Sequence, residues 1–344
     1  MVEWKKLGEV CEVLRGKRLT KSQLDEEKGY PVLHGGSTPM GYYVEYNRKA
    51  NTTVVVNTGN AGSVFFYDKE FWSSDACFSI YPNNELIDKF LYLYVYGCEH
   101  ILKGKIRAGA MPTIDAKAVE DLVIPIPPLD VQARIVGILD TFTASIDNLK
   151  EQIAQRRKQY EYYRDQLLDL EGKPGVEMKT LGDICEISRG VRVVKRDLEE
   201  SGIIPVFQNS LLPLGYYARS NNNGNTFVII GGAAGDIGYS EKPFWAADDC
   251  LCISGKEVLV DKFIYNFLIR DQHYLKSQVR KAGVPRLSRG VLDKLCIPVP
   301  SLSEQQRIVD ILDSFEASIQ NLEAQLKERE KQYEYYRNKL LTFE

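Results

Sequence analysis

Two long stretches of the chain carry mostly apolar residues at alternating steps of three and four. One begins at Leu139 and the other at Leu312. Steps that average 3.5 residues predict left-handed coiled-coil helices. The predicted seam positions are Leu139, Phe142, Ile146, Leu149, Ile153, Arg156, Tyr160, Tyr163 and Leu167 in the first stretch, and Leu312, Phe315, Ile319, Leu322, Leu326, Arg329, Tyr333, Tyr336 and Leu340 in the second.

Each heptad stretch follows about 125 residues with a different pattern. Short β-branched and aromatic runs, such as 52–56 and 226–230, alternate with segments rich in Gly, Asn and Pro, which is typical of a mainly β domain. Apolar residues at steps of three and four predict one helix over 86–102 and another over 259–275. The expected fold class of each domain is therefore α+β.

The chain is an internal duplication. The segment Leu129–Ile146 returns as Leu302–Ile319, a displacement of 302 − 129 = 173 residues, and Leu7–Gly16 returns as Leu181–Gly190, a displacement of 174. A period this long excludes a solenoid and indicates a tandem copy of one domain plus one helix.

The duplication predicts four segments. They are a first domain over 1–128, a long helix over 129–172, a second domain over 173–301 and a second long helix over 302–344. Lys173-Pro174-Gly175 is the obvious hinge between the copies. If the first helix leads away from its domain and the second returns, the helices lie antiparallel with a pseudo-twofold axis, and one domain sits at each end of a rod of roughly 63 Å.

Composition fits a globular protein with two cores, because 344 residues are 44% hydrophobic and 26% charged. No run approaches 18 apolar residues, so we expect neither a membrane span nor a secretion signal. Seven cysteines are an odd number, and Cys11/Cys185 and Cys77/Cys250 are equivalent positions of the two copies. This pattern favours buried thiols in a reducing, cytoplasmic setting.

Sequence signatures of catalysis are nearly absent. The glycine-rich segment 231–236 lacks the Lys-Ser/Thr of a phosphate-binding loop, so we expect it and its counterpart 57–63 to form structural turns. Pro127-Pro128 lies in IPPL, which is not the Asn/Asp-Pro-Pro-aromatic signature of an amino-methyltransferase. We expect no catalytic residue, no metal site and no cofactor in this chain.

Three further sets of polar residues favour structural roles over chemical ones. His100 and His273 occupy equivalent places on the predicted domain helices, where a polar or packing role is favoured. Cys250-x-Cys252 lacks a second ligand pair at zinc spacing. Asp75 and Asp248 share the context Phe-Trp-x-x-Asp, which favours a turn cap over an acid without a paired carboxylate.

The net charge of −3 argues against a polycation that binds nucleic acid by bulk attraction, so a nucleic-acid surface must be local. Basic and amide residues cluster at equivalent places in both copies. A solvated surface is the plain alternative, but arginine binds guanine edges and amides bind adenine edges, and we favour DNA contact. The candidate DNA-binding residues are Arg15, Lys17, Arg18, Lys103, Lys105, Arg107, Arg189, Arg192, Lys195, Arg196, Gln208, Asn209, Arg280, Lys281, Arg286 and Arg289.

Two doubled motifs carry a family resemblance. A W/M-K-x-L-G-[ED]-[VI] start opens each copy at Trp4–Val10 and Met178–Ile184, and IPxPxLxxQxRIVxILD closes each domain at Ile124–Asp140 and Ile297–Asp313. Over its whole length the chain resembles the specificity subunit of a Type I restriction-modification enzyme. The resemblance implies a non-catalytic reader of double-stranded DNA with two target-recognition domains and a bipartite, asymmetric target. It also implies that the chain docks two modification subunits, which use S-adenosylmethionine, and with them restriction subunits, which use ATP and Mg.

The residues predict a compatible mechanism. Two different base-reading domains on a rigid helix pair would touch DNA at two places with a fixed separation. One alternative is a coiled-coil scaffold whose β domains bind proteins, which would lack salt-sensitive, sequence-selective duplex binding. An enzyme with chemistry at Asp75 or Asp248 ranks third.

Arg156 and Arg329 form the polar layer of the seam. Both lie near the middle of their helices, so in an antiparallel pair they would lie close together. With carboxylate partners this layer would fix the register of the coiled coil. The alternative is that both side chains extend to solvent. The expected partners are Glu151, Glu328, Glu330 or acidic groups of a docked subunit. Tyr160 and Tyr163 are expected inside the seam, whereas Tyr162 and Tyr335 are expected on a surface for partner helices.

Overall fold

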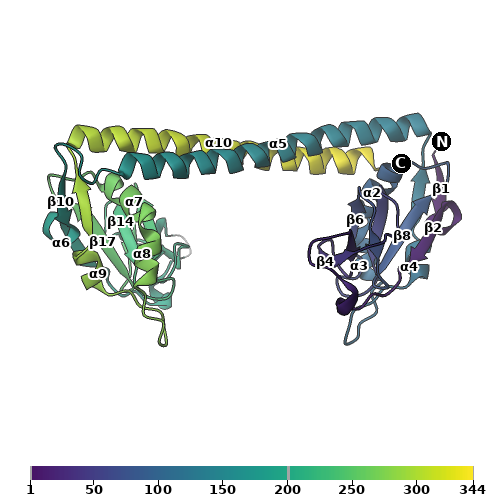
Figure 1. The fold of residues 1–344 in the computed structure, drawn as a ribbon, viewed down its shortest axis with the longest axis horizontal. Helices are drawn as coiled ribbons and strands as arrows, with labels where there is room; N and C mark the ends of the chain where they lie inside the picture. The colour runs from purple at the N-terminus through teal and green to yellow at the C-terminus, as the bar shows by residue number, and fades with distance from the viewer. Residues whose placement is uncertain (1, 200–201, 344) are drawn as a thin grey trace. The chain divides into compact units, whose positions relative to one another are not determined.

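The computed structural model describes residues 2–199 and 202–343. It contains two compact units (Figure 1). Unit 1 comprises Met1–Lys150 and Ala324–Glu344, and unit 2 comprises Glu151–Glu323. Each unit therefore holds one globular domain and one half of each long helix, which cuts across the chain-order division expected from the duplication.

The domain of unit 1 contains three small sheets. Strand β5 lies inside the largest, where its Thr52–Val56 run is buried on both faces, as its β-branched residues favour. The antiparallel four-stranded sheet has the order β2 (Cys11–Arg15), β8 (Cys77–Pro82), β5 (Thr52–Val56) and β6 (Val64–Tyr67); the three-stranded sheet has the order β4 (Pro39–Tyr43), β3 (Tyr30–Leu33) and β7 (Trp72–Ser73); and β1 (Glu3–Lys6) pairs with β9 (Val123–Ile126).

The domain of unit 2 repeats this topology, which confirms the predicted duplication and the α+β class. Its four-stranded sheet has the order β11 (Cys185–Arg189), β17 (Cys250–Gly255), β14 (Asn225–Ile229) and β15 (Ile237–Ser240); its three-stranded sheet has the order β13 (Gly215–Tyr217), β12 (Ile204–Phe207) and β16 (Trp245–Ala246); and β10 (Glu177–Thr180) pairs with β18 (Cys296–Val299).

The single helices expected over 86–102 and 259–275 are each two helices. The chain turns at Cys98 and at Asp271, where ψ is 7° and 11°. The turn lets both helices of a pair bury apolar residues in one core. The short helices are α1 (Leu7–Val10), α2 (Asp88–Gly97), α3 (Glu99–Gly104) and α4 (Ala116–Glu120) in unit 1, and α6 (Leu181–Ile184), α7 (Asp261–Arg270), α8 (Gln272–Ser277) and α9 (Arg289–Asp293) in unit 2, with 3-10 turns at Lys21–Gln23 and Lys195–Asp197.

In unit 1 the long helices α5 (Leu129–Leu168) and α10 (Leu302–Leu340) pair antiparallel. Phe142 stacks on Tyr336 with ring centroids 5.2 Å apart, and Lys150 Nζ lies 3.7 Å from Glu330 Oε1. Residue numbers thus rise on one helix as they fall on the other. The end of α10 also joins the domain core, where Phe343 lies 6.2 Å from Phe90.

In unit 2 the other halves of these helices also pair antiparallel. Arg157 Nη2 donates to Glu323 Oε1 at 2.6 Å, and Tyr163 stacks on Phe315 at 5.3 Å. Leu168, at the end of α5, is fully buried in the domain core. Among the described residues, no helix is both long and apolar enough to cross a membrane.

The arginine layer differs from the expectation. The guanidinium of Arg156 lies 5.9 Å from the ring centroid of Phe315, and that of Arg329 lies 5.6 Å from that of Phe142. Glu330 instead pairs with Lys150. An aromatic face attracts a cation without the cost of desolvating a carboxylate. That the two arginines lie close together stays a prediction.

A buried glutamine ties each long helix to its domain. In unit 1 the Gln132 side chain has no exposed surface; its Oε1 accepts from Ile87 N at 2.9 Å, and its Nε2 donates to Glu85 O and Pro127 O, both at 2.8 Å. Gln305 makes the same three bonds in unit 2, to Val260 N, Val258 O and Pro300 O, each at 2.9 Å. This geometry explains the glutamine of the repeated IPxPxLxxQ segment.

Replacing Gln305 with Met should lower the free energy of unfolding by roughly 2–3 kcal/mol, because one buried and two partly buried hydrogen bonds to the backbone are lost. Gln306→Met, at the exposed neighbouring position, should change it by less than about 0.5 kcal/mol. Urea denaturation of the two variants checks this, and equal midpoints would contradict the role of the buried amide.

Candidate nucleic-acid interface

In unit 1, the segment after β2 is held against the loop after β7. Arg15 Nε donates to Asp75 O at 3.0 Å, Gly16 N to Cys77 O at 3.1 Å and Lys17 N to Ser73 O at 2.9 Å. A Cβ on Gly16 would lie 2.1 Å from the carbonyl oxygen of Ser74, so only glycine fits. Arg15, Lys17 and Arg18 are exposed on this segment.

The loop after β5 joins the same surface. Asn57 Nδ2 donates to Asp75 O at 3.1 Å, and Asn57 O accepts from Ile114 N at 2.9 Å. Ile114 follows a hairpin whose arms pair at Arg107 and Thr113. One chain of hydrogen bonds therefore joins the Arg15 segment, the Asp75 loop and the Arg107 hairpin.

Unit 2 builds the equivalent surface. Arg189 Nε donates to Asp248 O at 2.8 Å, and Arg286 Nη1 donates to Asp249 Oδ1 at 2.5 Å. Asn209 is exposed, and its carbonyl accepts from Ala233 N at 2.9 Å. Arg189, Asn209 and Arg286 are thus brought to the loops that flank β14 and β17.

Tryptophans that share the Phe-Trp motif support both surfaces. Trp72 Nε1 donates to Lys17 O at 2.7 Å, and Trp245 Nε1 donates to Val191 O at 2.8 Å. Each indole packs edge-on with ring centroids 5.0 Å from a tyrosine, Tyr43 or Tyr217. The repeated tryptophan and tyrosine could have marked this support from sequence.

Other candidate cations have partners within their own domain. Lys103 Nζ lies 2.5 Å from Glu99 Oε2 on α3, Lys105 Nζ donates to Ala118 O at 3.5 Å, and Arg289 Nε lies 3.4 Å from Asp293 Oδ2 on α9. Arg107 pairs with Asp115. Arg192, Arg196, Arg280 and Lys281 are exposed, Gln208 is half-buried, and the side chain of Lys195 lies outside the described residues.

Two residues of unit 1 belong to the surface without having been singled out. His34 Nδ1 lies 2.8 Å from Ser74 Oγ, and Arg48 Nη2 donates to Arg15 O at 2.9 Å. Burial lowers the pKa of the Arg48 guanidinium. Arg48 aligns with no basic residue in the second copy, so the repeat gave no signal for it.

The turn-cap interpretation of Asp75 is wrong. The loop is capped by Ser74, whose Oγ accepts from Ala76 N at 3.2 Å, since its short hydroxyl reaches the amide two residues on. Asp75 Oδ1 and Asp248 Oδ1 are buried without a hydrogen-bond partner in the described part of the chain. Both carboxylates therefore retain free acceptor capacity beside the arginine segments.

The predicted structural groups are at ordinary positions. Gly62 N and Gly235 N close the glycine-rich turns onto Val56 O and Ile229 O, both at 2.8 Å, which confirms the turn prediction. His100 Nδ1 lies 3.1 Å from Gly97 O. Burial raises the pKa of Cys77 to about 11, so this thiol is a poor nucleophile. Across residues 2–199 and 202–343, no cluster of three His, Cys, Asp or Glu could hold a metal.

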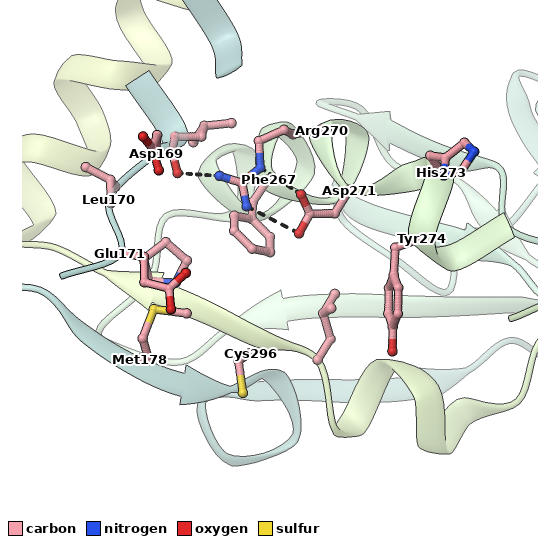
Figure 2. A pocket seen from close by; sticks show the side chains of 13 residues that line it. Asp169, Leu170, Glu171, Met178, Phe267, Arg270, Asp271, His273, Tyr274 and Cys296 are labelled. Atoms are coloured by element: carbon pink, nitrogen blue, oxygen red, sulfur yellow. Dashed lines mark hydrogen bonds and ion pairs between the residues drawn. The ribbon is translucent and has the colours of Figure 1, made fainter. Parts of the chain in front are cut away.

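A pocket in unit 2 lies at the end of α5 (Figure 2). Arg270 dominates it: Nη1 donates to Leu168 O, and the guanidinium pairs with Asp271 at 2.7 Å and lies 4.4 Å from the Phe267 centroid. The guanidinium of Arg270 thus binds the C-terminal end of α5 to α7. The pocket is thus a structural joint, apart from the loops that carry Arg189 and Arg286.

Comparison with known proteins identifies the architecture. The family model for the Type I restriction modification DNA specificity domain matches residues 1–156 and 174–330. The chain belongs to this family. It is 30% identical, over 99% of its length and 96% of the relative's, to a putative type I restriction enzyme specificity subunit of Haemophilus influenzae. It is 28% identical to the specificity subunit of a type I restriction enzyme of Escherichia coli, covering 99% and 94% of the two chains.

A solved structure has the same fold. The S subunit of a Type I restriction-modification system from M. genitalium matches with a TM-score of 0.75 at 21% identity, covering 100% of this chain and 97% of that one. The chain is thus a DNA sequence-specificity subunit with two domains of one fold. The scaffold alternative is not favoured.

Gly16→Ala should destabilise unit 1 by about 1–3 kcal/mol, because the added methyl group meets backbone that cannot move away easily. Gly36→Ala is the matched control, since nothing lies within 4 Å of its Cβ position. Thermal unfolding followed by circular dichroism compares the variants, and a Gly16→Ala protein as stable as Gly36→Ala would refute the close approach.

Proposed function

We propose that this specificity subunit reads a bipartite DNA target, one half with each domain, and has no catalytic site of its own. The observation that carries the proposal is that the two domains share the same backbone arrangement at the candidate surface but carry different polar side chains there. Arg15 and Arg189 donate to equivalent loop carbonyls. Beside them, His34 stands where the second copy has Gln208, and Thr113 stands where it has Arg286.

These differences have the chemistry of base discrimination. Arginine can bind guanine through O6 and N7, and an amide such as Gln208 or Asn209 can bind adenine through N6 and N7. Exposed lysines such as Lys17 and Lys281 suit phosphates, which position the protein without carrying sequence information. Two domains with one frame and different donors would therefore read different half-sites.

The methyl donor and the energy source belong to partners in this proposal. S-adenosylmethionine would bind to two modification subunits, and ATP and Mg to restriction subunits, in the cytoplasm. Tyr162 and Tyr335, which are 61% and 60% exposed on the long helices, suit contact with partner helices, because aromatic residues are enriched in interface cores. Acidic groups of a docked subunit remain candidate neighbours of Arg156 and Arg329.

The helix pair would also set the gap between half-sites. Helix rise is fixed at about 1.5 Å per residue, whereas each base pair adds about 3.4 Å. Inserting a few residues into both helices would therefore change the spacing that the enzyme accepts. A protein-binding scaffold would show no such dependence and no salt-sensitive, sequence-selective duplex binding.

Exchanging residues 1–128 for the corresponding domain of another specificity subunit should change one half of the methylated sequence and leave the other half and the gap unchanged. Methylated positions mapped across the host genome give the readout. The parental chain expressed in the same host is the control. A change in both halves would show that the domains do not read independently.

The purified chain should transfer no methyl groups to DNA, because no methyl-donor motif is present in its sequence. Incorporation of labelled methyl groups is measured with the chain alone and after addition of the modification subunit encoded in the same host. Activity of the chain alone would overturn the non-catalytic assignment.

A further inference from the structure

Each unit carries an exposed apolar side chain near the tip of a hairpin. The hairpins comprise Arg107–Thr113 and Arg280–Arg286, and each extends beyond the rest of its own unit (Figure 1). Met111 is 65% exposed and Val284 is 62% exposed, and each is followed by an exposed proline. These positions are equivalent in the duplication, since 284 − 111 = 173.

The hairpin of unit 1 is stiff at its base. Arg107 N donates to Thr113 O at 2.8 Å, and Gly59 N donates to Pro112 O at 3.3 Å. Ile114, which follows, is buried in the core. The base is thus tied to the domain while Met111 stays in solvent.

The hairpin of unit 2 is anchored in the same way. Arg280 N donates to Arg286 O at 2.9 Å, Gly232 N donates to Pro285 O at 3.3 Å, and Leu287 is buried. The ion pair of Arg286 with Asp249 adds a further tie. The backbone that carries Val284 is therefore already ordered, so binding would cost little conformational entropy.

The surroundings of both tips favour a polyanion. Arg107 at the base of the Met111 hairpin is exposed and paired with Asp115, and the Val284 hairpin carries exposed Arg280 and Lys281 beside Arg286, which is paired with Asp249. The residues between base and tip differ, with Ala108 replaced by Lys281, but the apolar residue and its proline recur. An exposed apolar side chain on a basic hairpin matches the wedges with which DNA-binding proteins separate stacked base pairs.

We propose that Met111 and Val284 each insert between adjacent base pairs of their half-site and partly unstack them. This inference rests on the proposed DNA-reading function and assigns the hairpin tips a role that hydrogen-bonding residues cannot fill. The hydrogen-bonding surface around Arg15 or Arg189 would select the sequence. The wedge would open one step of it, which would make a base more accessible to a modification subunit.

The test uses the full chain assembled with its host's modification subunits and no S-adenosylmethionine. Duplexes that contain the methylated sequence carry 2-aminopurine at successive positions of each half-site. Fluorescence should rise at a step of each half-site with the wild-type chain. Met111→Ala should lower the rise at least fivefold in the first half only, Val284→Ala in the second half only, and Met111→Leu should keep it.

Matched controls remove an exposed apolar side chain elsewhere in the same unit. Val44 and Ile203 are 76% and 84% exposed, and Val44→Ala and Ile203→Ala should leave the fluorescence unchanged. Circular dichroism verifies that all variants fold. If the Met111→Ala chain bound its duplex selectively and gave wild-type fluorescence, the wedge proposal would be overturned and the proposed function would stand. If the wild-type assembly bound no duplex selectively, both would be overturned.

Discussion

The structure depends on a buried amide at the point where each domain becomes a long helix. Gln132 and Gln305 each satisfy one backbone N–H and two carbonyl groups, which come from two separate stretches of backbone. A side chain that lacked either the donor or the acceptor would leave some of these polar groups unpaired at the junction. Each junction therefore fixes the direction in which the helix leaves its domain.

The candidate DNA-binding surface is equally constrained by the close approach of backbone segments. Gly16 and Gly190 pass so near the following loop that a Cβ would lie 2.1 Å from a carbonyl oxygen, and the tryptophans Trp72 and Trp245 hold the next residues by their indole N–H. The backbone conformation of these segments is therefore tightly restricted. The two copies therefore differ in the side chains that this backbone carries, such as Arg286, where the first copy has Thr113.

Sequence periodicity was sufficient to predict the duplication, the α+β class and the antiparallel helices, because these follow from patterns that extend over many residues. Local interactions were harder to predict. Two short helices joined at Cys98 keep the apolar spacing of one helix. Arg156 lies over the ring of Phe315 rather than beside one of the expected carboxylates, and Ser74, not Asp75, caps the loop. The helix predicted from the sequence ended at residue 102, whereas α3 extends to Gly104 and brings Lys103 onto the same helix face as its ion-pair partner Glu99.

The unit of folding differs from the unit of duplication. Tyr333 and Phe343, near the end of the chain, pack against the core of unit 1. Leu168, at the end of α5, is buried in the core of unit 2, although α5 begins in unit 1. Each domain thus needs side chains from the other copy to complete its core. Because each long helix is divided between the two units, a substitution in the helix of one copy can act on the unit that holds the domain of the other copy.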